Sequence, residues 1–345
     1  MIENRIIRVG ISVGDLNGVG IELILKTFED KRIYELCTPV VYASEKVMSF
    51  YKKQLKFNYP LNFISDAKGI ERGKLNVVKV WDDVVDLNPG TPTQVSGQKA
   101  FESLSAATDA LNNADVDVLL TCPISKENIQ SDTFSFPGHT EYLESKIQGE
   151  SLMILMSHSI KMGLVTGHIP VAQVSGALNK DLICKKIDIM YESLLQDFGV
   201  TKPRIAVLGL NPHCGDHGVI GKEDDELIRP IVAEYQEKGQ IVYGPYAADG
   251  FFGNQSYLKF DAVISMFHDQ GLVGFKAVSF GEGVNFTAGL SKVRVSPDHG
   301  TAFDLAGEGK SSVSSFKEAL YQGVAILKKR EEYKKLSGNK LKTKK

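Results

Sequence analysis

The sequence predicts an α/β protein of two domains, and three observations support this expectation. Short apolar runs alternate with longer amphipathic segments, which is the pattern of strands joined by helices. The chain has 345 residues, more than one ordinary hydrophobic core accommodates. Several apolar runs end in polar, glycine or proline residues, and in open α/β sheets ligands bind beyond the carboxyl ends of the strands. We therefore expect a site built from the segments that follow the strands.

Strands and helices are expected to alternate along the chain. The clearest strand candidates are residues 8–13, 40–43, 116–121, 162–166, 204–210 and 262–267. Helix-like stretches cover residues 97–112, 180–198 and 223–238. The last of these begins in an acidic cluster and is followed by Gly239, which suits the helix dipole and a glycine cap. Residues 271–300 are rich in glycine without a clear period, so we expect an ordered loop and an edge strand there.

The composition excludes several classes of protein. With 43% hydrophobic and 24% charged residues, it is that of a soluble globular protein. The net charge of −2 gives no electrostatic reason to expect nucleic acid or an anionic membrane as a partner. The most apolar stretch, residues 151–165, contains His158 and Lys161 and is too short to span a bilayer. The four cysteines form no C-x-x-C pair, which fits a reducing compartment, so we expect a cytoplasmic protein.

The C-terminal end is basic. Residues 328–345 carry nine Lys and Arg against Glu331 and Glu332, so this end has a charge of +7 and the remainder −9. Such a tail could bind an anionic partner, but a frayed and solvated end is the expectation.

Three histidines stand in the same structural context. His168, His213 and His268 each lie one to three residues beyond a predicted strand. A single histidine there is more often a capping or hydrogen-bonding residue. Three of them indicate a shared metal site, because imidazole is a common ligand of zinc and similar ions, and three protein ligands leave an open position for catalysis. We expect His158 and His217, which lack this context, to be structural.

The segment Gly14-Asp-Leu-Asn-Gly-Val-Gly20 follows the first predicted strand. Its glycine spacing does not match the dinucleotide-binding fingerprint. A glycine-rich turn before a helix can still leave backbone N–H groups for an anion or a cofactor. A tight turn is the alternative.

A second set of residues suits a phosphorylated substrate. Lys276, Asn285 and Arg294 offer charge and neutral donors of the kind that a phosphate monoester needs, with solvated surface cations as the alternative. His139 and Thr140 precede a helix-like run, which Thr140 could cap while both side chains face a ligand.

The loop that follows Asp298 contains small residues between a histidine and an aspartate. It reads Asp298-His-Gly-Thr-Ala-Phe-Asp-Leu-Ala-Gly307. Small residues permit the close approach of a flat ligand, and an aspartate can accept hydrogen bonds from both ribose hydroxyls. An ordinary junction between a loop and a helix is the alternative.

Taken together, these segments resemble one family, the 4-hydroxythreonine-4-phosphate dehydrogenases of pyridoxal phosphate biosynthesis. The resemblance extends from Gly14 to about Leu320. Its most specific motifs are Phe136-Pro-Gly-His-Thr-Glu141, Leu210-Asn-Pro-His213, His268-Asp-Gln-Gly-Leu272, Gly283-Val-Asn-Phe-Thr287 and Asp298-His-Gly-Thr-Ala302.

The resemblance implies a fold and an assembly. The expected fold has two α/β/α domains with a cleft between them, as in isocitrate and isopropylmalate dehydrogenases. Residues 1–135 with 300–330 would form the cofactor-side domain, residues 136–299 the domain for metal, substrate and dimerisation, and 331–345 the basic tail. The expected assembly is a homodimer with active sites shared between its subunits.

The resemblance also implies an activity, the NAD-dependent oxidation of 4-phosphooxy-L-threonine to 2-amino-3-oxo-4-phosphooxybutanoate, which decarboxylates to 3-amino-2-oxopropyl phosphate. It implies that His168, His213 and His268 bind a divalent metal, zinc or else magnesium, manganese or cobalt. The residues implied to contact the substrate are His139, Thr140, Lys276, Asn285 and Arg294. Those implied to hold NAD are Gly14, Asp15, Gly18, Gly20, His299, Gly300, Thr301, Ala302 and Asp304.

Several points stay open. The group that removes the proton is one of Asp249, Asp269 and Lys126. The sequence departs from the family pattern at Leu16-Asn17, Cys122, Val273-Gly274, Pro297 and residues 246–250. These departures leave room for a sister-branch substrate, D-threonate or D-erythronate 4-phosphate. A phosphate acyltransferase on a related fold, which needs no histidine triad, and a non-catalytic metal- or phosphate-binding protein are the alternatives from other classes.

Overall fold

The computed structural model describes residues 6–279 and 281–338. The chain divides into two compact units. The first comprises Met1–Gly149 and Leu290–Ala325, and the second comprises Glu150–Gly289 and Ile326–Lys345. The expectation from the sequence divided the chain instead after residues 135 and 299.

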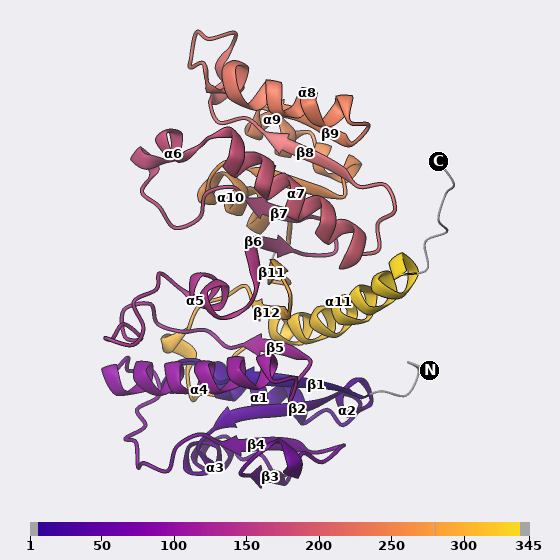
Figure 1. The fold of residues 1–345 in the computed structure, drawn as a ribbon. Coiled ribbons are helices and arrows are strands. Elements are labelled where there is room, and N and C mark those ends of the chain that lie inside the picture. Colours follow the sequence, from indigo (N-terminus) through magenta and orange to yellow (C-terminus); the bar gives the residue numbers. More distant parts are fainter. Residues whose placement is uncertain (1–5, 280, 339–345) are drawn as a thin grey trace. The chain divides into compact units, whose positions relative to one another are not determined.

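The secondary structure of the first unit is shown in Figure 1. Its strands are β1 (Ile7–Ser12), β2 (Cys37–Ala43), β3 (Leu61–Ile64), β4 (Leu75–Lys79), β5 (Val118–Thr121) and β12 (Val293–Pro297). Its helices are α1 (Gly20–Phe28), α2 (Ile33–Leu36), α3 (Glu45–Gln54), α4 (Gln94–Asn112) and α5 (His139–Lys146). Helix α11 (Ser314–Gly338) begins in this unit and continues in the second.

The strands of the first unit are parallel and pair in the order β3-β4-β2-β1-β5-β12. All seven residues of β2 and all four of β5 are buried, as expected for a parallel sheet covered on both faces. Helix α5 belongs here because Tyr142 and Leu143 pack in one buried core with Leu104 and Leu111 of α4. Strand β12 belongs here because it pairs with β5.

The second unit is also mixed α/β. Its strands are β6 (Gly149–Met156), β7 (Lys161–Leu164), β8 (Arg204–Leu208), β9 (Ile241–Tyr246), β10 (Ala262–Ser265) and β11 (Val284–Leu290). Its helices are α6 (Val171–Ala177), α7 (Lys180–Gln196), α8 (Arg229–Glu237), α9 (Ala248–Gly253) and α10 (His268–Ser279). The strands pair in the order β11-β6-β7-β10-β8-β9. Strands β7, β10, β8 and β9 are parallel neighbours, and β6 runs antiparallel to β7.

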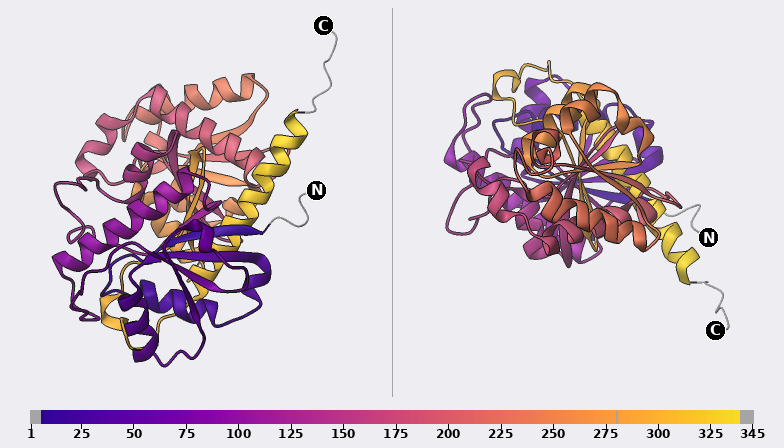
Figure 2. Two further views of the ribbon diagram at one scale, coloured as in Figure 1. Left: turned by 60° about the horizontal axis from the view of Figure 1, so that its bottom comes forward. Right: turned by 90° about the horizontal axis from the view of Figure 1, so that it is seen from above.

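The predicted α/β class is confirmed. In each unit, helices lie on both sides of the strands (Figure 2). Each of the six predicted strands overlaps one of the observed strands β1, β2, β5, β7, β8 and β10. The apolar stretch at residues 151–165 contains most of β6 and all of β7. Among the described residues, no helix is long and apolar enough to cross a membrane.

The prediction for residues 271–300 is wrong in its element types. Helix α10 runs through Ser279, and two strands follow it, β11 and β12, where the sequence predicted a loop and one edge strand. Two glycines within α10 interrupt the pattern of side chains by which a helix is recognised in a sequence. A Cβ atom at Gly271 would lie 2.4 Å from Ser265 Oγ, and one at Gly274 would lie 2.3 Å from the Phe252 ring. Close packing thus selects glycine where a helical pattern would show a side chain.

The C-terminal segment also differs from its prediction. Its described part is not frayed, because α11 continues to Gly338. Arg330 within this part is buried, and its Nε atom donates to Asp197 Oδ1 at 2.7 Å. The remainder of the predicted tail lies outside the described residues.

Candidate active site

The three predicted metal ligands lie in the second unit, at the carboxyl ends of three parallel strands. His168 follows β7, His213 follows β8 and His268 begins α10 directly after β10. The backbone of His213 is left-handed, with φ 53°, within a short helical turn over Pro212–Gly215. The sheet order β7-β10-β8 makes β10 the middle of the three strands.

The structure brings two of the three histidines together. The ring centroids of His168 and His268 lie 5.4 Å apart. His268 Nδ1 lies 2.7 Å from Asp269 Oδ1, a contact that orients the ring and leaves Nε2 for another partner. Within residues 6–279 and 281–338, no three His, Cys, Asp or Glu side chains form a group that could hold a metal ion. One chain therefore provides a pair of imidazoles rather than a triad.

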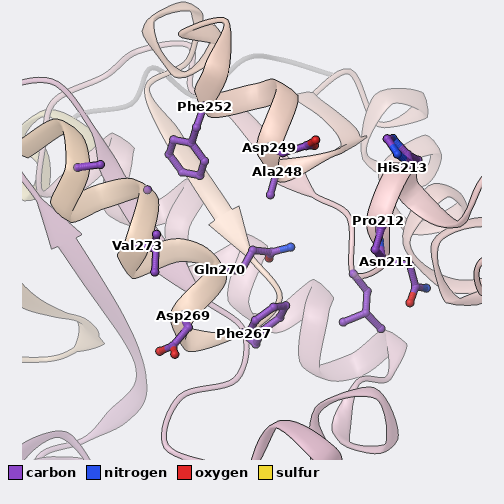
Figure 3. A pocket seen from close by; sticks show the side chains of 13 residues that line it. Asn211, Pro212, His213, Ala248, Asp249, Phe252, Phe267, Asp269, Gln270 and Val273 are labelled. Carbon is purple, nitrogen blue, oxygen red and sulfur yellow. The ribbon is translucent and has the colours of Figure 1, made fainter.

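His213 lies instead beside a pocket of about 820 Å³ (Figure 3). Figure 3 shows His213 and Asp249 on one side of this pocket and Asp269 on the other, with Gln270 between them. Gln270 is fixed, because its Nε2 donates to Gly209 O at 2.6 Å and its Oε1 accepts from Met266 N at 2.8 Å. The remaining lining is mainly apolar: Leu210, Pro212, Ala248, Phe252, Phe267, Val273, Gly274 and Ala277.

Lys276 and Asn285 belong to the second unit as well. Lys276 is exposed on α10, not on a loop as the sequence suggested. Asn285 is on β11, and its Oδ1 is a buried atom for which the described residues offer no hydrogen-bond partner. An unsatisfied buried amide oxygen of this kind is a candidate ligand-binding atom.

Two of the other predicted substrate residues, Arg294 and His139, lie together in a cationic site of the first unit. Arg294 on β12 is only 2% exposed. Its Nε and Nη2 atoms donate to Thr121 Oγ1 at 3.1 and 2.6 Å, across the pairing of β12 with β5. Burial lowers the pKa of Arg294 to about 9, against the opposing effect of the Glu141 carboxylate, so the guanidinium stays charged at neutral pH. A buried guanidinium of this kind can bind an anion such as a phosphate.

His139 adds a neutral ring to this site. Burial, with Arg294 and Lys126 adding to it, holds the pKa of His139 well below 6.5, so its ring is neutral at neutral pH. The residue is partly exposed, but its Nε2 atom is buried and has no hydrogen-bond partner among the described residues. Helix α5 begins at His139 after Gly138, whose backbone is extended, so Thr140 does not cap the helix as expected.

The first turn does not present a surface to a ligand. Gly14, Asp15, Gly18 and Gly20 are all buried. A Cβ atom at Gly14 would lie 2.2 Å from Pro123 O, and one at Gly20 would lie 2.1 Å from Val13 O. The protein's own backbone thus fills the space that these glycines create, which is the tight-turn alternative. Burial also raises the pKa of Asp15, whose Oδ1 accepts from the Asn17 N–H at 3.0 Å.

The second predicted cofactor segment is accessible. Gly300 and Asp304 are exposed, and His299, Thr301 and Ala302 are partly exposed. Ala302 has φ 42°, a left-handed conformation that non-glycine residues rarely adopt. His299 Nδ1 lies 3.0 Å from Gly300 O, whereas its buried Nε2 has no hydrogen-bond partner within the described residues.

Comparison with known proteins decides the family. The model of the family described as "Pyridoxal phosphate biosynthetic protein PdxA" matches residues 35–323. The chain belongs to the PdxA family. A relative from Bacteroides thetaiotaomicron named 4-hydroxythreonine-4-phosphate dehydrogenase is 46% identical over 343 residues, which are 99% of this chain and 94% of the relative. This confirms the resemblance inferred from the motifs.

Two further PdxA-like proteins bear on the substrate and the fold. A protein from Oceanobacillus iheyensis with a provisional name of D-threonate 4-phosphate dehydrogenase is 34% identical, over 92% of this chain and 97% of its own. The crystal structure of a 4-hydroxythreonine-4-phosphate dehydrogenase from Burkholderia phymatum superimposes with a TM-score of 0.75 at 31% identity. It covers 94% of this chain and 99% of its own.

The contacts of two residues near the predicted site could not be read from the sequence. Thr121, which ends a predicted strand and begins a polar segment, accepts hydrogen bonds from Arg294. The polar segment indicated a site there, but not the partner of Thr121. Gly274 replaces a residue of the usual family pattern and lies against Phe252, which itself lines the pocket. This contact across a distance of 22 positions in the sequence had no local signal.

Proposed function

We propose that this protein oxidises 4-phosphooxy-L-threonine to 2-amino-3-oxo-4-phosphooxybutanoate, which then decarboxylates to 3-amino-2-oxopropyl phosphate. The observation that carries the proposal is the near-complete alignment with a 46% identical 4-hydroxythreonine-4-phosphate dehydrogenase. The phosphate acyltransferase and the non-catalytic binding protein considered from the sequence lose their support, because the chain belongs to the PdxA family.

We assign binding of the substrate phosphate and its neighbouring groups to the predicted substrate residues. Arg294 provides a buried positive charge whose orientation Thr121 fixes. The neutral ring of His139 can donate or accept one hydrogen bond at its buried Nε2. Thr140, Lys276 and Asn285 complete the proposed substrate set. Binding the unreactive phosphate tightly would hold the reacting carbon in place during the oxidation.

We assign the metal to His168 and His268 of one subunit with His213 of a partner subunit. The 5.4 Å separation of the His168 and His268 rings supports the first part of this assignment. The position of His213 beside a largely apolar pocket supports the second, because a partner could cover that pocket. A divalent metal there, zinc or else magnesium, manganese or cobalt, would polarise the substrate hydroxyl and lower its pKa. Asp269 would hold the His268 ring in its ligating orientation.

Proton removal is assigned to Asp249 or Lys126. Asp249 is exposed beside His213 in the pocket. Lys126 lies close enough to His139 to lower its pKa. Asp269, the third candidate, is the least suited because its carboxylate is already engaged with the His268 ring.

NAD is the proposed hydride acceptor, held by the loop with His299, Gly300, Thr301, Ala302 and Asp304. The accessible backbone of this loop and the buried Nε2 of His299 support that assignment. The buried first turn supports only an indirect role for Gly14, Asp15, Gly18 and Gly20. We place the proposed enzyme in the cytoplasm, since both its substrate and NAD are intracellular metabolites. The metal assignment above requires it to act as a homodimer.

Turnover with matched substrates tests this proposal. The purified protein is given NAD and either 4-phosphooxy-L-threonine, D-threonate 4-phosphate or D-erythronate 4-phosphate, and NADH formation is followed. We expect the highest kcat/KM with 4-phosphooxy-L-threonine, loss of activity with a chelator, and recovery when zinc, magnesium, manganese or cobalt is added. A higher kcat/KM with either sugar-acid phosphate would instead assign the chain to the sister branch, and full activity in the chelator would exclude the metal.

A further inference from the structure

Glu22 on α1 is a charged side chain that is fully buried. Its Oε1 accepts from the Ser311 N–H at 2.9 Å and its Oε2 accepts from the Gly309 N–H at 3.2 Å. A buried carboxylate is unfavourable unless hydrogen bonds satisfy its oxygens. Two backbone donors do so here, and both belong to the loop between β12 and α11, residues 298–313. Glu22 therefore stabilises one conformation of that loop, because a different conformation would leave the carboxylate without both donors.

Two more residues of the same helix region hold this loop. Lys26 Nζ donates to the carbonyl oxygens of Gly309 at 2.9 Å and Ser311 at 2.6 Å. The Val19 N–H, just before α1, donates to Thr301 O at 3.0 Å. The loop is thus held near its beginning and again near its end. The residues that hold it, which we call the α1 clamp, are Val19, Glu22 and Lys26.

The held loop contains strained backbone. Ala302 is left-handed at φ 42° and ψ 54°, a conformation that a Cβ atom disfavours. Such residues persist where the surrounding structure fixes them, and they occur at ligand-binding segments. The contact of Val19 with Thr301 lies one residue before the strained position. The clamp is therefore placed to keep the loop in a conformation that it would not adopt unaided.

We propose that the α1 clamp holds the 298–313 loop so that its residues 299–304 are positioned for the nucleotide. Glu22 is then a positioning residue for cofactor binding. The inference rests on the proposed function, because it takes this loop to be the nucleotide site. It also gives the glycine-rich first turn a role. The turn is too buried to touch a cofactor, but it directs α1 and the Val19 N–H toward the loop.

Glu22→Gln tests the clamp. Glutamine keeps the shape, but its amide nitrogen cannot accept a hydrogen bond from a backbone N–H. We expect the Kd for NADH, measured by titration without substrate, to rise about tenfold. The KM for the phosphorylated substrate should stay within about twofold. Amide hydrogen exchange at Gly309 and Ser311 should become faster, which reports on the loop without any activity measurement.

Lys26→Met provides a second variant, so the test does not depend on Glu22→Gln folding. The Lys26 side chain is 27% exposed, so we expect a smaller rise in the NADH Kd, about two- to threefold. The double variant should weaken NADH binding by less than the product of the two single effects, because both residues act on one loop.

Asn76→Ala is the matched control. Asn76 is also fully buried in the first unit, and its amide donates to the carbonyl oxygens of Pro39, Glu71 and Lys74. Its loss should lower Tm and leave the NADH Kd unchanged.

The outcomes separate the clamp from the proposed function. If the wild type binds no NADH, the proposed function fails and the clamp with it. If the wild type, Glu22→Gln and Lys26→Met bind NADH equally, the clamp is overturned while the cofactor assignment stands. An Asn76→Ala variant that weakens NADH binding as much as Glu22→Gln would attribute the effect to general destabilisation and would also overturn the clamp.

Discussion

The cationic site of the first unit and the histidines of the second unit differ in how completely a single chain brings their residues together. Arg294 is buried and held by two hydrogen bonds to Thr121, and His139 is close enough for Arg294 to lower its pKa. The histidines are more exposed, and only His168 and His268 lie near each other.

The difference follows from the elements that carry each set. Arg294 and Thr121 lie on adjacent strands, whose spacing of about 4.8 Å fixes their approach. The histidines lie beyond strand ends, where loops determine the direction of each side chain. A metal needs its nitrogen ligands at about 2.0–2.1 Å, and of the three histidines this chain brings only His168 and His268 near each other. A set on neighbouring strands can be completed by one chain, whereas a set on strand-end loops can draw on a second chain.

The largest effect is expected from the histidines. His168→Ala, His213→Ala and His268→Ala should each lower kcat/KM on the order of 10³-fold or more, because each would remove a ligand of the group that activates the substrate hydroxyl. Bound metal, measured by elemental analysis, should fall in parallel while the circular dichroism spectrum is kept. His217→Ala, a few residues beyond His213, is the control and should remain active. Wild-type activity in any of the three variants would remove that residue from the metal set.

Arg294→Ala should have the next largest effect. Losing a charged hydrogen-bonding group costs about 1.5–3 kcal/mol, which corresponds to a rise of about ten- to a hundredfold in KM for the phosphorylated substrate. Steady-state kinetics with varied substrate measures this. Arg229→Ala removes an exposed arginine of the second unit and should leave KM unchanged. Equal use of a dephosphorylated substrate by the wild type would contradict the phosphate assignment.

The buried His139 predicts a pH dependence of stability. Its pKa is lowered in the folded protein, so its contribution to stability is complete above the unfolded pKa near 6.5 and is lost as the pH falls below it. The slope from this single group is at most about 1.4 kcal/mol per pH unit. Denaturant unfolding between pH 5 and pH 8 should show a shallower dependence for His139→Gln than for the wild type. Identical slopes for the two would show that folding does not lower the pKa of His139.

Thr121 should give the smallest effect. Thr121→Val keeps the shape but removes the acceptor of Arg294, so the guanidinium should lose its fixed direction rather than its charge. A neutral hydrogen bond contributes about 0.5–1.5 kcal/mol, so KM for the substrate should rise about two- to tenfold. Thr121→Ser restores the hydroxyl and should restore KM. If the serine variant is as impaired as the valine variant, packing rather than the hydrogen bond explains the role of Thr121.

The sequence predicted the strand framework because buried parallel strands such as β2 and β5 are continuous apolar runs. It also placed His168, His213 and His268 beyond strand ends, since a strand end is visible as the point where an apolar run stops. The element that carries Lys276 could not be predicted. Gly274 interrupts the helical pattern because the Phe252 ring, which is distant in the sequence, leaves no room for a side chain there.

The role of the first turn was equally invisible from the sequence. A sequence places glycine alike where the backbone packs closely and where a ligand approaches. The structure favours close packing, because Pro123 O lies against Gly14. The pairing of Arg294 with Thr121 depends on the register of β12 with β5, two strands that lie 173 positions apart at these residues. No local pattern determines that register.

Complementation between inactive subunits tests the central claim, that two histidines of one chain act with the third from a partner. An equimolar mixture of His168→Ala and His213→Ala chains, refolded together so that subunits exchange, is assayed for NADH formation. One site of each heterodimer then has His168 and His268 from one chain and His213 from the other, all intact. The control mixture, His168→Ala with His268→Ala, leaves a defect in every site because these two residues come from the same chain.

We predict that the first mixture regains about a quarter of wild-type activity, since half of the dimers are mixed and each has one intact site, and that the control mixture stays inactive. If mixed dimers form and the first mixture also stays inactive, each metal site is built within one chain and the account is contradicted.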